Sequence, residues 1–146
     1  MDLWTVQGTV AAPVAAVAGL LLAVSEGRVG HDNLLVLAGA SAARQGAMTV
    51  VAGPGPGCYR ADLAGRVEPV EIRVDLAHST LAVQSWYAGV YTVTECAAGA
   101  LVTHGVHRVV PSHPGFVDGL AELGLRARMR RDLVEVLGVV ADRLGC

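Results

Sequence analysis

Apolar and polar side chains alternate along the stretch from Val70 to Val110, with a few short interruptions. The alternation is clearest at its start, where apolar residues at 70, 72, 74 and 76 are separated by Glu71, Arg73 and Asp75. A period of two is typical of a β-strand with one buried and one wet face. The interruptions are short enough for tight turns and fall at His78–Ser79, Ala88–Gly89 and Ala98–Gly99. The sequence therefore predicts successive antiparallel strands joined by hairpins.

The length of these turns decides which side chains share a face of the sheet. With two-residue turns Tyr87 lies opposite Val90, and directly opposite residues share a face. One face then collects nine residues: Ile72, Val74, Val83, Ser85, Tyr87, Thr92, Thr94, Thr103 and His107. We expect these residues to line a ligand cavity together with Leu133 and Leu137 of a later helix. The other face carries most of the charged residues with Trp86, Tyr91 and His104, and we expect it to contact solvent.

Short elements precede this region. We expect a strand over Leu3–Val10, a helix over Pro13–Val24, a turn region over Ser25–Asn33 with room for a short helix, and short strands over Leu34–Leu37, Ala47–Ala52 and Cys58–Leu63. The run from Gly53 to Gly57 alternates glycine and proline and indicates a turn. It is not a phosphate-binding loop, because its prolines lack amide donors and no Gly-Lys-Ser/Thr follows.

The period changes after Pro111. Apolar residues recur at three- and four-residue spacing, which predicts a long helix over Pro114–Leu144. Four arginines form a basic patch within it: Arg126, Arg128, Arg130 and Arg131. This patch is either a solvated outer face or a contact for a small anion or an acidic partner.

Composition limits the class of protein. A chain of 146 residues predicts a single domain over residues 1–146. Its 53% hydrophobic content excludes a disordered chain, and a net charge of −2 argues against nucleic-acid binding. The apolar window Thr9–Val24 is too short to span a bilayer, and no Lys or Arg before Arg28 supplies the positive region of an export signal. With widely spaced cysteines and no CxxC pair, we expect a cytoplasmic protein with reduced thiols.

The order of these elements resembles the SRPBCC superfamily, the START-like helix-grip fold that includes polyketide cyclase-like proteins. The resemblance rests on the strand-to-helix entry Val6–Val14, the meander Glu71–Val110 with its strand start Gly99–His104, and the terminal helix Phe116–Cys146. It implies an α+β fold in which a curved antiparallel sheet of about six or seven strands wraps around the long C-terminal helix. Members of this superfamily hold hydrophobic molecules between sheet and helix, and some catalyse cyclisation or dehydration there.

Few residues offer chemistry beyond binding. His104 and His107 are three apart on one strand and point to opposite faces, so we expect no metal site, and we expect no cofactor. Tyr87 with His107 forms either a general acid–base pair, a ligand-orienting pair or a polar corner of the core. Trp86 and Tyr91, expected on the wet face, are candidates for a dimer contact.

Three functional hypotheses follow. The first is a carrier or sensor that binds a small hydrophobic molecule. The second is a cyclase or dehydratase acting on a polyketide-like substrate through Tyr87 and His107. The third is a homodimeric interaction module whose cavity is filled by side chains and whose contact is the Trp86/Tyr91 face.

Overall fold

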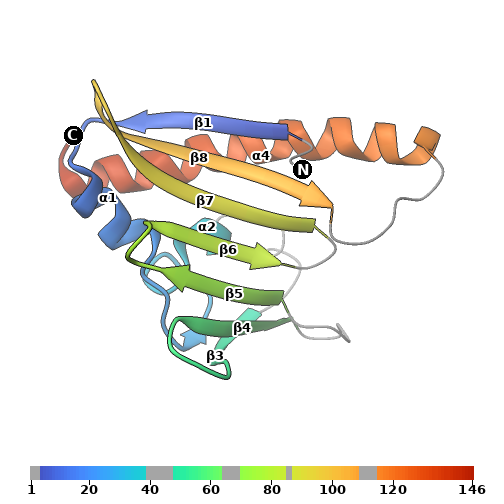
Figure 1. Cartoon of the computed structure of the whole chain (residues 1–146), viewed down its shortest axis with the longest axis horizontal. Coiled ribbons are helices and arrows are strands. Elements are labelled where there is room, and N and C mark those ends of the chain that lie inside the picture. The colour runs from blue at the N-terminus through green and yellow to red at the C-terminus, as the bar shows by residue number, and fades with distance from the viewer. Residues whose placement is uncertain (1–3, 39–47, 64–69, 85–86, 109–114) are drawn as a thin grey trace.

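The computed structural model describes residues 4–38, 48–63, 70–84, 87–108 and 115–146. Its centre is one antiparallel sheet of eight strands in the order β1-β8-β7-β6-β5-β4-β3-β2 (Figure 1). The strands span Trp4–Val10 (β1), Gly27–Arg28 (β2), Met48–Ala52 (β3), Cys58–Leu63 (β4), Val70–Asp75 (β5), Thr80–Gln84 (β6), Tyr87–Cys96 (β7) and Gly99–Arg108 (β8). The α+β class is confirmed, although the sheet has eight strands and not about six or seven.

The described chain also contains helices α1 (Val14–Leu21), α2 (Leu35–Ala38) and α4 (Gly115–Leu144). α1 follows Pro13, whose φ of −61° suits the entry to a helix. The predicted strand over Leu34–Leu37 is wrong, since most of that segment forms α2. Its residues 34 to 36 are all buried, so the segment has no alternation that separates a helix from a strand. None of the helices in the described ranges is long and apolar enough to cross a membrane.

The helices pack on one face of the sheet, which we call the inner face, and the opposite face is the outer face. α4 contributes Met129, Leu133, Val136, Leu137 and Val140 to the buried core. Leu137 lies against Gly8 of β1, where any side chain would collide with it, so Gly8 permits α4 to approach this strand closely. α4 runs alongside β1 and β8 in Figure 1.

The register confirms two of the predicted hairpins in face and corrects the third. Val74 pairs with Leu81, and Thr92 pairs with Thr103. Each partner is two residues from the expected one, so the two residues of each pair share a face with each other, as predicted. The hairpin between β6 and β7 differs, because Gln84 pairs with Ala88 and Val83 with Gly89, so Ala88–Gly89 belongs to β7 and not to a turn. This shift is odd, so residues 90–96 of β7 and all residues of β8 exchange faces relative to the prediction, whereas position 87 keeps its predicted face.

Candidate functional site

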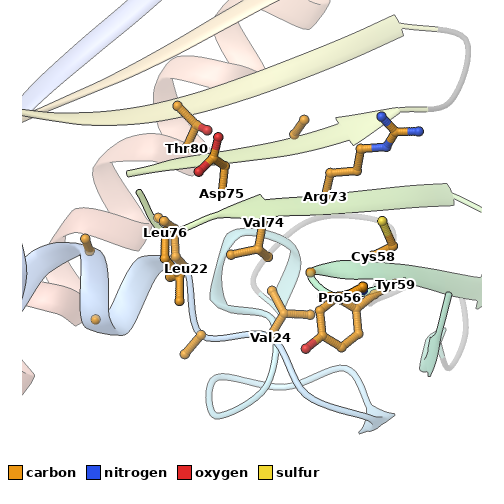
Figure 2. A pocket seen from close by; sticks show the side chains of 15 residues that line it. Leu22, Val24, Pro56, Cys58, Tyr59, Arg73, Val74, Asp75, Leu76 and Thr80 are labelled. Atoms are coloured by element: carbon orange, nitrogen blue, oxygen red, sulfur yellow. The ribbon is translucent and has the colours of Figure 1, made fainter. Parts of the chain in front are cut away.

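An open cleft of about 900 Å³ lies where the β5–β6 hairpin extends past the turn between β3 and β4 (Figure 2). Its walls come from the end of α1, the segment after it, that turn and the hairpin. We call it the end cleft and define it by its labelled side chains: Leu22, Val24, Pro56, Cys58, Tyr59, Arg73, Val74, Asp75, Leu76 and Thr80. The lining is predominantly apolar, which suits an apolar ligand.

Alternation along β5 gives the end cleft two kinds of wall. Val74 shares the inner face with its partner Leu81, whereas Arg73 and Asp75 belong to the outer face. Because the cleft lies at the end of the sheet, residues of both faces reach it. The apolar and polar groups are thus arranged around one strand end.

The turn between β3 and β4 is held by backbone hydrogen bonds. Gly53 N donates to Cys58 O at 2.8 Å, and Val74 N donates to Gly57 O at 2.8 Å. Gly57 has a φ of +73°, and a Cβ there would lie 2.6 Å from Val74 O. Only glycine fits this position, which confirms the predicted turn and fixes Pro56 and Cys58 against β5.

The segment after α1 is fixed by a buried side chain, that of Asn33. Its Oδ1 accepts a hydrogen bond from Gly30 N at 2.7 Å, and its Nδ2 donates to Ser25 O and Gly27 O at 3.2 and 3.1 Å. These bonds satisfy backbone groups of the loop that carries the chain away from Val24. Val24, half-buried, is thereby held at the cleft wall.

The end of β5, at the tip of the β5–β6 hairpin, carries the acidic group of the site. Asp75 accepts hydrogen bonds from His78 N at 3.2 Å and pairs with His78 Nδ1 at 2.7 Å. The hydrogen bond with the His78 side chain lowers the pKa of Asp75 from its ordinary value, so this exposed carboxylate stays ionised. Leu76 beside it is 74% exposed.

Most residues predicted for a cavity do not meet at the end cleft. Val74 lines it, whereas Ile72, Leu133 and Leu137 are buried in the core and Val83 is half-buried on the inner face. The predicted inner position of Thr92, Thr94, Thr103 and His107 is wrong, because the β6–β7 register places all four on the outer face. There Gln7 Nε2 donates to Thr103 Oγ1 at 3.2 Å.

The register also places the two residues of the predicted acid–base pair, Tyr87 and His107, on different faces of the sheet. His107 pairs with Ala88, and Tyr87 pairs with Arg108 one position further along. Directly paired residues share a face, so residues 87 and 107 belong to opposite faces. The side chains of Ser85, Trp86 and Tyr87 lie outside the described residues.

Tyr91 and His104, expected in solvent, are instead stacked inside the core. Their ring centroids are 3.9 Å apart with an interplanar angle of 11°, and the residues are 7% and 9% exposed. Burial raises the pKa of Tyr91, and the negative charge of Asp132 on α4 raises it further. Burial lowers the pKa of His104 to about 4. Both rings are therefore neutral near pH 7. Tyr91 is consequently not available for the predicted Trp86/Tyr91 dimer contact.

Sequence reasoning missed most of the cleft lining. Leu22, Val24, Pro56 and Tyr59 were assigned to a helix, a turn and a short strand without a common role. The sequence offers no signal that joins these segments, because they are distant along the chain and meet only in the folded sheet. Among the described residues, no group of three or more His, Cys, Asp or Glu side chains could hold a metal ion.

The architecture defines this chain as an α+β protein whose antiparallel sheet packs one face on a long C-terminal helix. The same fold occurs in the KanY protein, whose solution structure was determined by NMR, with a TM-score of 0.54. The similarity covers 97% of this chain and 96% of that chain at 21% sequence identity, a level that establishes a shared fold and nothing further. No family model matches the chain, and no curated protein matches it.

Proposed function

We propose that this protein binds a small, mainly apolar molecule in the end cleft and acts as a carrier or sensor. The observation that carries the proposal is Leu76, which is 74% exposed on the wall of a cleft of about 900 Å³. Burying a leucine side chain contributes roughly 1.5–3 kcal/mol, so a ligand that covers Leu76 gains a large hydrophobic term. The volume falls within the roughly 300–1,000 Å³ of small-molecule sites.

The polar wall favours a ligand with one uncharged polar group. Arg73 and Asp75 bring opposite charges to the same wall, and Thr80 pairs directly with Asp75. A ligand of either charge meets one repulsive group there, whereas a carbonyl or hydroxyl finds both donors and acceptors. An apolar body with a single such group matches both walls.

The resemblance to the SRPBCC superfamily supports the same ligand class, since its members bind hydrophobic molecules against a curved sheet. The place differs from the expected one. Between α4 and the sheet, Leu133 and Leu137 are buried in the continuous core, so the proposed ligand lies at the sheet end and not under the middle of this helix. Acid–base chemistry by Tyr87 and His107 is not favoured, because positions 87 and 107 lie on opposite faces of the sheet.

Titration with the uncharged apolar fluorophore N-phenyl-1-naphthylamine tests the proposal. We expect saturable fluorescence enhancement with one site per chain. Gly19→Leu should weaken binding by about tenfold, because Gly19 lines the cleft and a Cβ there meets no atom within 4 Å. The substitution also improves helix propensity by about 1 kcal/mol, so α1 should not be destabilised.

Gly124→Leu is the matched control, since Gly124 is an exposed glycine of α4 whose Cβ also meets open space within 4 Å. It lies outside the cleft lining and should leave the fluorophore affinity unchanged. Enhancement that never saturates, or an affinity that Gly19→Leu does not alter, would refute the proposed site.

A further inference from the structure

β1 is an unprotected sheet edge. It pairs with β8 on one side, and no strand of the described residues pairs with its other side. Natural edge strands commonly carry charges or proline against pairing with another chain, but β1 reads Trp-Thr-Val-Gln-Gly-Thr-Val and has neither. Among the described residues, one backbone hydrogen bond reaches β1 from outside the sheet: Ala12 N donates to Val10 O at 2.9 Å.

The flank of α4 beside this edge exposes the apolar side chain of Val134, one helical turn from exposed Arg130 and Arg131. Leu137 lies over Gly8 of β1, which fixes the side of the helix that faces the strand. With 3.6 residues per turn, Val134 is about 60° from Leu137 in one direction and Arg143 about 120° in the other. Arg143 Nη2 binds Asp32 Oδ1 at 3.0 Å, on the side of α1 and α2. Val134, which is 68% exposed, therefore points beyond the β1 edge.

We propose that two copies of this chain associate through β1, antiparallel about a two-fold axis near Gln7, to form one continuous sheet. In this register Gln7 lies opposite Gln7 of the partner subunit, and Thr5 lies opposite Thr9 of the partner subunit. All three residues are exposed and uncharged, and such cross-strand pairs stabilise a sheet. The same axis brings the two α4 flanks together and covers both Val134 side chains.

A second copy fits this edge better than a foreign strand. A two-fold contact uses the same patch on both subunits, so the patch must complement itself. The β1 edge does so because it carries no charge that would repel its own copy. On the α4 flank, Gly138 and half-buried Ala141 are small and leave room beside Val134 for the partner's helix.

Sedimentation equilibrium of the full chain, from about 1 to about 100 μM, tests the proposal. We expect a monomer–dimer equilibrium in the unaltered protein. Gln7→Lys and Gln7→Glu each place like charges face to face and should raise the dissociation constant by more than about tenfold. An equimolar mixture of the two variants should restore the dimer, since opposite charges then meet.

Two further variants keep the result decisive. Thr49→Lys places the same charge on exposed Thr49 of β3, near the other end of the sheet, and should dimerise like the parent. Val134→Glu should weaken the dimer without touching β1, and it decides the outcome if circular dichroism shows Gln7→Lys to be unfolded. A parent chain that stays monomeric, a dimer insensitive to the β1 and α4 variants, or a mixture that fails to associate would overturn the proposal.

Discussion

At the scale of single residues, His104 makes the stability of this protein depend on pH. Its pKa falls from 6.5 to about 4 on folding because burial disfavours the charged imidazolium. The unfolded chain therefore binds a proton that the folded chain does not. The contribution of His104 to the free energy of unfolding is therefore fully present above pH 6.5. It falls by about 3 kcal/mol in total as the pH falls toward 4.

Urea denaturation at pH 7 and at pH 4.5 measures this loss. His104→Phe keeps a ring against Tyr91 and removes the titration, so its free energy of unfolding should fall less between these pH values. His31→Gln is the control, because it replaces an exposed histidine. Equal slopes for the parent and His104→Phe would contradict the assignment to His104.

Gly89 shows why the interior of the sheet was difficult to predict at this scale. Glycine beside alanine between two alternating runs predicts a turn at this position. In the structure Gly89 lies within β7, where a Cβ would lie 2.8 Å from His104 Nε2. Glycine is needed here for the approach of a ring and not for a turn, and sequence alone does not separate these two uses.

At the scale of secondary-structure elements, the β7–β8 hairpin depends on its glycine. Gly99 has a φ of +131°, and a Cβ there would lie 2.7 Å from Val10 O and 2.8 Å from Ala12 N. These are backbone atoms, which cannot move aside as a side-chain end does. Gly99→Ala should therefore destabilise the protein by at least about 2 kcal/mol, measured by urea denaturation.

Gly124→Ala in α4 is the corresponding control. A Cβ at Gly124 meets nothing within 4 Å, and alanine is the better helix former by about 1 kcal/mol. This variant should be as stable as the parent or more so. If Gly99→Ala were equally harmless, the close contact of this hairpin with the β1–α1 connection would be disproved.

Most elements were predictable because their signals are local. The period of two gave β5 to β8, and the spacing of three and four gave α4. The faces of β7 and β8 depended on one turn, and its odd shift moved the predicted cavity residues Thr92, Thr94, Thr103 and His107 outward. The apolar positions Val93, Val102 and Val106 favour the observed register, and they were a usable signal. The end cleft was not predictable, since its walls meet only in three dimensions.

At the scale of the whole molecule, the two large hydrophobic side chains that are exposed in the described chain mark separate regions. Leu76 belongs to the end cleft at β5, and Val134 belongs to α4 beside β1. The strands β8, β7 and β6 lie between β1 and β5 in the sheet. Their inner face carries buried residues, including Leu81, Tyr91 and Val102, so neither region can change shape by rearranging a loose interior.

This separation predicts that ligand binding and self-association are independent. Coupling requires that the ligand contact the two association states differently, and no residue of the end cleft lies on β1 or α4. The fluorophore dissociation constants of the parent and of Gln7→Lys, measured where the parent is dimeric, should therefore agree within about twofold. A difference above about fivefold, which corresponds to a coupling free energy near 1 kcal/mol, would mean that the sheet transmits a change between β1 and the end cleft. Gly19→Leu provides the reciprocal measurement, since a variant with a blocked cleft should dimerise with the same dissociation constant as the parent.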